Sequence, residues 1–115
     1  MAFVVKKYAT HRVPVEIHVP DEEKPSTIHA TWKLLPFSDY RETSKDLNLG
    51  KMDDNALVNR DLVSLEDLKD EKGKALPYTP ELLEGLLELT FFRRALINSW
   101  VAAQECAPEA RAKNW

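Results

Sequence analysis

Two of the three histidines, His18 and His29, are the residues best placed for metal chemistry. They lie in two segments of alternating polarity, and a hairpin that pairs Val19 with Ile28 sets both imidazoles on its outer face. A cross-strand histidine pair can bind zinc, but zinc usually takes a third or fourth protein ligand, and Glu16 is the nearest candidate. We therefore interpret the two histidines as solvated side chains, and we predict no metal site and no cofactor.

Nucleophilic catalysis has equally little support in the sequence. The single cysteine, Cys106, follows the last helix-forming segment, where the negative end of a helix dipole disfavours a thiolate. The chain has no nucleophile-elbow motif, no phosphate-binding loop and no H-E-x-x-H pair. The acidic group of Asp67, Asp70 and Glu71 lacks the ligand spacing of an EF-hand and is interleaved with lysines. We predict no catalytic residue and expect that the protein is not an enzyme.

The composition argues against several classes of partner. The 115-residue chain has 16 basic and 19 acidic residues, a net charge of −3, and no run of Lys and Arg that would form a nucleic-acid-binding face. No apolar stretch approaches the roughly 20 residues of a membrane helix, and the apolar run near the N-terminus is too short for a signal peptide. One unpaired cysteine fits a reducing compartment. We expect a soluble cytoplasmic protein that binds neither nucleic acid nor membrane.

Residues 3–35 alternate between apolar and polar side chains, which is typical of half-buried β-strands. Pairing Val19 with Ile28 aligns three further apolar pairs, which are Ile17 with Ala30, Val15 with Trp32 and Val13 with Leu34. Pro14 cannot donate a hydrogen bond to a ladder, so its strand is expected at an edge. The segment from Phe3 to Tyr8 is a candidate third strand.

Residues 36–74 are more polar. Ser38 as a cap and Gly50 as a stop predict one short helix between them. The apolar series from Leu57 to Leu68 predicts a second short helix that runs into a strand or loop. A charged turn is expected around Gly73.

Residues 77–105 show the clearest helical pattern. Thr79 is a favourable N-cap, Pro80 suits the first helical position, and leucines then recur every three or four residues. A tight joint at residues 89–91, with Thr90 as the second cap, leads into another helix that Pro108 should end. We predict a single α+β domain over residues 1–107, in which a small antiparallel hairpin or sheet at the N-terminus packs against C-terminal helices. Residues 108–115 are expected to form a flexible tail, and for Trp115 both docking on the domain and binding to a partner stay open.

The two C-terminal helices carry more large apolar side chains than one thin hairpin face can cover. We therefore predict an exposed contact surface on them, and such a surface on a small domain usually marks a binding site. Its residues are Leu83, Leu86, Leu87, Phe92, Leu96 and Trp100. Phe92 and Trp100 are the expected anchors, because aromatic side chains dominate many interfaces. The same surface could instead close a homo-oligomer.

The stretch from Leu68 to Gln104 combines several features in a fixed order. An acidic turn with a glycine is followed by the step Leu-Pro-Tyr-Thr-Pro-Glu, a leucine helix, and an aromatic-led helix that ends in small residues. This pattern resembles the tail assembly chaperones of long-tailed bacteriophages. The resemblance implies a small non-enzymatic α+β protein that binds the tape measure protein in the host cytoplasm, with the tail tube protein as a second candidate partner.

Two other functions stay open at this level. A structural tail completion or connector subunit would assemble into a ring and remain in the finished particle. A small metal-dependent hydrolase would use His18 and His29 as metal ligands.

Overall fold

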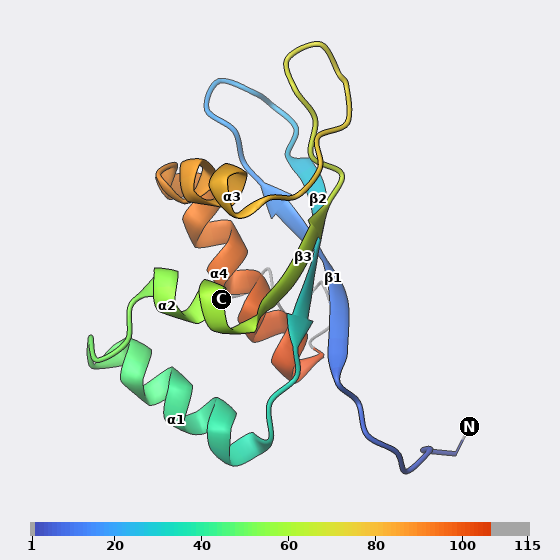
Figure 1. Ribbon diagram of the computed structural model, residues 1–115, viewed down its shortest axis with the longest axis vertical. Coiled ribbons are helices and arrows are strands. Elements are labelled where there is room, and N and C mark those ends of the chain that lie inside the picture. The colour runs from blue at the N-terminus through green and yellow to red at the C-terminus, as the bar shows by residue number, and fades with distance from the viewer. Residues whose placement is uncertain (1, 107–115) are drawn as a thin grey trace.

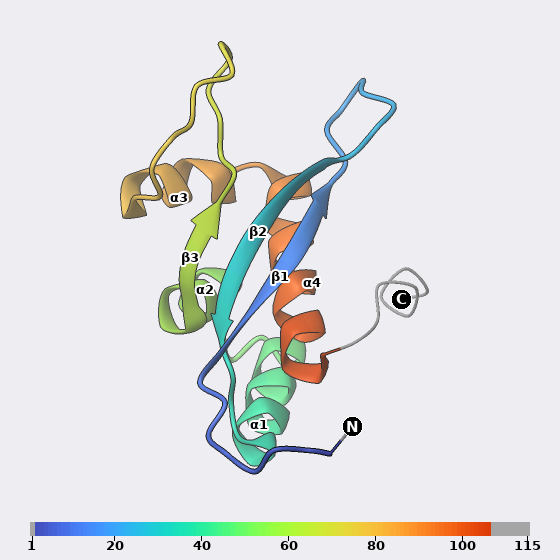
Figure 2. The ribbon, with the colours of Figure 1, turned by 90° about the vertical axis from the view of Figure 1, so that its right-hand side faces the viewer.

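The computed structural model describes residues 2–106 and contains both strands and helices (Figure 1). In chain order the elements are β1 (Thr10–Ile17), β2 (Ser26–Lys33), α1 (Phe37–Asn48), α2 (Asp54–Asp61), β3 (Leu62–Glu66), α3 (Pro80–Leu87) and α4 (Thr90–Glu105). The strands form an antiparallel sheet in the order β1-β2-β3. Figure 2 shows α2 and α4 behind this sheet, and no helix of residues 2–106 covers its other face. The expected α+β fold, with an N-terminal sheet packed against C-terminal helices, is confirmed.

The hairpin of β1 and β2 forms in a different register from the expected one. The sequence predicts Val19 opposite Ile28, but Ile28 pairs with Val15. The loop between the strands is the cause: the Glu22 N–H donates to the Val19 carbonyl at 3.2 Å, and this turn takes Val19 out of the strand. The shift is four residues, an even number, so the same alternate side chains still face the core.

The third strand comes from residues 62–66, beside β2, and the expectation of a strand from Phe3 to Tyr8 is wrong. At the other edge, the Ala9 carbonyl accepts a hydrogen bond from the Leu34 N–H at 3.0 Å. Backbone groups alternate in direction along an antiparallel ladder, so the odd residues from 9 to 17 bond towards β2 and the even ones point outward. Pro14 is even-numbered and its missing N–H costs the sheet nothing, in agreement with its expected place on an edge strand.

Of the three helix caps predicted from the sequence, one is confirmed. The Thr79 Oγ1 atom accepts from the Leu82 N–H at 3.1 Å, and Pro80 opens α3, so this predicted cap is confirmed. Ser38 lies inside α1, which begins one residue earlier after Pro36, so its predicted capping role is wrong. Thr90 is the first residue inside α4, so its predicted capping role is also wrong.

The cap position of α4 belongs to Leu89, which makes no side-chain capping bond. The joint between α3 and α4 is tight, because the Leu89 N–H donates to the Leu86 carbonyl at 3.0 Å, and this turn puts Leu89 at the cap position.

The short helix expected from Leu57 onward is α2, and it runs directly into β3. A turn also forms around Gly73, whose φ of 80° favours glycine. Pro108 and the predicted tail at residues 108–115, Trp115 included, lie outside the described residues.

The core lies between the sheet and α4, around two buried tryptophans. The Trp32 Nε1 atom, from β2, donates to Ser99 Oγ of α4 at 2.9 Å, and Ser99 Oγ donates to the Leu96 carbonyl at 2.6 Å. Trp100 Nε1 donates to the buried carboxylate of Asp61 at 2.9 Å. Each indole therefore has a polar partner as well as apolar neighbours, and the two bonds fix α4 against β2 and α2.

Candidate functional site

The structure places the six residues of the predicted contact surface mostly in the core. Leu83, Leu87, Phe92, Leu96 and Trp100 are all buried. The expectation that they form an exposed patch is therefore wrong. The sheet has a third strand and carries α4 across its face, so it covers far more apolar surface than the thin hairpin assumed from the sequence.

Leu86 is the exception, and it belongs to a partly exposed apolar strip along one flank of α3. Leu82 and Leu86 lie four residues apart on one flank of the leucine stripe, where they are half-buried and pack against the rim of the core, whereas Leu83 and Leu87 are buried in it. Leu89 follows at the joint and is 41% exposed. We call Leu82, Leu86 and Leu89 the α3 strip. Figure 1 shows α3 at the edge of the molecule.

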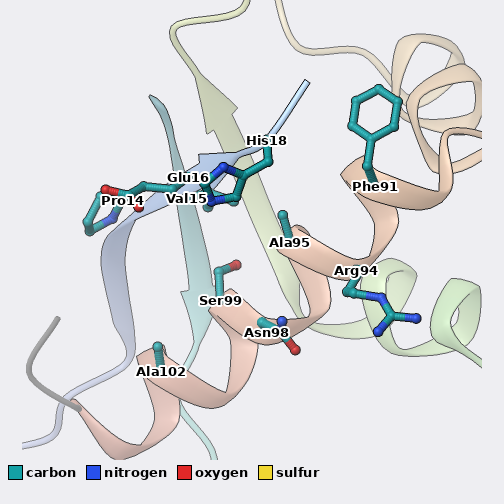
Figure 3. A pocket seen from close by; sticks show the side chains of 10 residues that line it. All are labelled: Pro14, Val15, Glu16, His18, Phe91, Arg94, Ala95, Asn98, Ser99 and Ala102. Atoms are coloured by element: carbon teal, nitrogen blue, oxygen red, sulfur yellow. The ribbon is translucent and has the colours of Figure 1, made fainter. Parts of the chain in front are cut away.

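A second candidate surface is a groove of about 380 Å³ between the outer edge of β1 and α4. Its lining residues are Pro14, Val15, Glu16 and His18 from β1 and its end, with Phe91, Arg94, Ala95, Asn98, Ser99 and Ala102 from α4. Figure 3 shows Ala95, Ser99 and Ala102 in a row along the helix beside the strand. These small side chains leave open space next to an unpaired strand edge. We call this feature the β1–α4 groove.

The polar side chains of the groove come from both of its walls. Glu16 and His18 come from the strand side, and Arg94 and Asn98 from the helix side. Neither Glu16 nor Arg94 forms an ion pair with any residue from 2 to 106. The groove therefore offers an apolar floor, charges of both signs at its rim, and free backbone groups along β1.

The histidines do not form the pair that the sequence suggests. His29 lies opposite Pro14 across the ladder, and its Nδ1 atom lies 2.7 Å from Asp67 Oδ2. His18 follows the end of β1 and lines the groove, so the expected His18–His29 pairing across the strands is wrong for the same reason as the register. The described part of the chain contains no group of three or more His, Cys, Asp or Glu side chains arranged to hold a metal ion.

The cysteine lies in an unusual backbone position. Cys106 caps the C-terminal end of α4 with a φ of 49°, in the left-handed region, and it is exposed. His11 Nδ1 donates to the Ala103 carbonyl at 3.0 Å and lies 3.5 Å from Cys106 Sγ. The imidazole proton on Nδ1 is thus directed to a carbonyl, which leaves this nitrogen unable to accept the thiol proton.

An N-terminal arm, residues 2–9, precedes β1 and forms neither a helix nor a strand. Phe3, Val4 and Val5 are 78%, 61% and 90% exposed. The interactions that involve the side chains of this segment are local: the Phe3 and Tyr8 rings are 6.0 Å apart, and Lys6 Nζ lies 5.2 Å from the Tyr8 ring centroid. Nothing in the sequence pattern distinguishes this apolar arm from a strand of the sheet.

The clearest electrostatic effects involve residues that belong to neither candidate surface. Burial, and then a hydrogen bond from its hydroxyl to Glu105, raises the pKa of Tyr40 to about 12. Burial also raises the pKa of Tyr78. The hydrogen bonds to Asp61, at 2.7 and 2.8 Å, raise the pKa of Arg60. These shifts belong to contacts that stabilise the fold.

No protein-family model, curated protein or solved structure matches this chain. Within residues 2–106, none of the helices combines the length and apolar character needed to span a bilayer.

Proposed function

We propose that this protein is a tail assembly chaperone of a long-tailed bacteriophage, a non-enzymatic protein that binds the tape measure protein before the tail tube polymerises around it. The pattern from Leu68 to Gln104 supports this proposal through its resemblance to that family. The α+β fold agrees with what the resemblance implies.

The α3 strip is the observation that carries the proposal. Leu82, Leu86 and Leu89 are three leucines in a span of eight residues. Leu82 and Leu86 are half-buried and Leu89 is exposed, whereas the other two leucines of α3 are buried. A short apolar strip on a helix is suited to an amphipathic helix of a partner, which would pack apolar face to apolar face. A tape measure protein offers many such helices.

The charge of the protein is consistent with this role. A net charge of −3 keeps a coated client dispersed, because the bound copies repel one another. The host cytoplasm is the place where such a complex would form, and the tail tube protein is a second candidate partner there.

Co-expression with the tape measure protein tests the proposal directly. The parent chain should keep the tape measure protein in the soluble fraction and co-purify with it. Leu86→Asp should weaken that binding at least tenfold, because it places a carboxylate in the middle of the strip. Leu49→Asp is the matched control, since Leu49 is 59% exposed at the end of α1 and lies outside the strip.

Both variants are first compared with the parent by circular dichroism and thermal unfolding. Equal binding by the folded Leu86→Asp variant and the parent would show that the strip is not the client site. Failure of the parent chain itself to bind or solubilise the tape measure protein would contradict the chaperone function.

The composition of purified particles separates a chaperone from a structural subunit. A chaperone should be missing from finished virions by quantitative mass spectrometry. A ring-forming completion or connector protein would instead be present in a fixed ratio to the major tail protein.

A further inference from the structure

We propose that the N-terminal arm of one copy docks in the β1–α4 groove of a second copy, and that reciprocal docking forms a two-fold symmetric dimer. This interaction uses neither the α3 strip nor a tape measure protein, so it goes beyond the proposed chaperone function.

The arm has the composition of a docking segment. Its three apolar side chains, Phe3, Val4 and Val5, are the most exposed group of large apolar residues described along the chain. Their exposure to water is unfavourable at about 25 cal/mol for each Å² of apolar surface. Docking in an apolar groove would remove this cost.

The groove has a free strand edge that the arm can extend. The even-numbered residues of β1 point their backbone groups outward, as the bond between Ala9 and Leu34 shows, and no strand of residues 2–106 lies beside them. Edge strands of this kind accept an added strand, with backbone bonds giving affinity and alternate side chains entering pockets. Of the outward N–H positions, Pro14 alone lacks the donor, so an added strand loses one bond there.

Backbone and side-chain alternation agree on which arm residues would enter the groove. In the docked state the arm extends β1 in line, so its even residues carry the outward backbone groups, as they do in β1, and symmetric antiparallel pairing sets them opposite even residues of β1. Phe3 and Val5 then lie opposite odd residues such as Val15, whose side chains face α4. The two most exposed large apolar side chains of the arm are thus the ones directed at the open space beside Ala95 and Ala102.

The occupant is a second copy, because the arm cannot reach the groove of its own chain. Ala9 is held by Leu34 in line with β1, so the arm leaves at the end of β1 opposite to His18 (Figure 1). The arm bends at Lys6, and residues 2–5 beyond the bend are too few to run back along residues 6–9 and on to the groove at Pro14. Antiparallel pairing of one segment with the same segment of a second copy has two-fold symmetry. Both arms therefore dock at once, and the assembly is a closed dimer.

Charge complementarity favours the same partner. The arm has two lysines, Lys6 and Lys7, and no acidic residue, so its charge is +2. Residues 10–115 therefore have a charge of −5, and the sum is the net charge of −3. Lys6 is even-numbered, and alternation therefore sets it on the same face of the extended sheet as Glu16 at the rim of the groove. A second copy of this chain thus provides the apolar and the basic groups that the groove would accept.

Sedimentation equilibrium of the full chain between about 1 and 200 µM tests the dimer. The parent chain should dimerise, and Phe3→Asp should raise the dimer dissociation constant at least tenfold. Phe37→Asp is the matched control, because Phe37 is 75% exposed and lies in neither the arm nor the groove. Leu86→Asp should also leave the dimer unchanged, which separates this test from that of client binding. A parent chain that stays monomeric throughout, or a dimer insensitive to Phe3→Asp, would overturn the proposal.

Disulfide capture tests the position of the arm. In a Cys106→Ser background, separate Phe3→Cys and Asn98→Cys proteins are mixed in equal amounts with oxidised glutathione. A cross-linked pair containing one of each is expected, since Asn98 is an exposed residue of the groove. Absence of that mixed pair contradicts the docking site. A double variant that cross-links within a monomer would show that the arm occupies its own groove, and would equally overturn the proposal.

Discussion

Replacing Ser99 with alanine should lower the free energy of unfolding by about 1–2 kcal/mol, although it removes a single oxygen atom. Ser99 Oγ accepts the hydrogen bond of the buried Trp32 indole at 2.9 Å. Alanine leaves that N–H without a partner in the core, at a cost of roughly 1–3 kcal/mol. Alanine is also the better helix former by about 0.5 kcal/mol, which offsets part of the loss inside α4.

Thermal and urea unfolding measure this change. For a chain of this size, a loss of 1–2 kcal/mol should lower Tm by roughly 4–8 °C. Ser38→Ala is the control for the generic effect of the substitution in a helix, since Ser38 is exposed in α1, and it should stay within about 0.5 kcal/mol of the parent.

A double-mutant cycle isolates the hydrogen bond itself. In a Trp32→Phe background there is no indole N–H to satisfy, so Ser99→Ala should cost less there by at least about 0.5 kcal/mol. If Ser99→Ala is as stable as the parent and shows no coupling to Trp32, the account of how α4 is held against β2 is wrong.

Three further perturbations test other parts of the fold. Thr79→Ala should cost about 1 kcal/mol by urea unfolding, because it removes the cap of α3, and an unchanged midpoint would contradict that role. Leu83→Ala should cost about 2–5 kcal/mol, because Leu83 is buried, while Leu86→Ala should cost about 1 kcal/mol or less, because Leu86 is only half-buried at the rim of the core; equal losses would contradict this difference in burial. Burial raises the folded-state pKa of Tyr40 to about 12, above its ordinary value of 10.0, so its contribution to stability is complete below pH 10 and is lost as the pH rises towards 12. The stability difference between the parent and Tyr40→Phe should therefore shrink over that range in stopped-flow or equilibrium unfolding, and a difference independent of pH would refute the assignment.

Local patterns in the sequence determined the features that depend on neighbouring residues alone. The start of α3 at Thr79 and Pro80 follows from the chemistry of a cap and of a missing N–H, and no distant residue is needed to form it. The faces of β1 and β2 follow from alternation, which survives the four-residue error in register because the shift is even. Pro14 on an edge strand is of the same kind.

The tertiary structure alone decided what each of those faces meets. Residues 3–8 and 62–66 are both short apolar segments, and pairing of the second with β2 left the first as an exposed arm. On α3, periodicity groups four leucines into one stripe, but the position of α4 and the sheet determines that Leu83 is buried and Leu86 stays accessible. The physical reason is that periodicity describes the orientation of a side chain relative to its own backbone. Burial depends on segments far away in the sequence, whose pairing is chosen by the free energy of the whole domain.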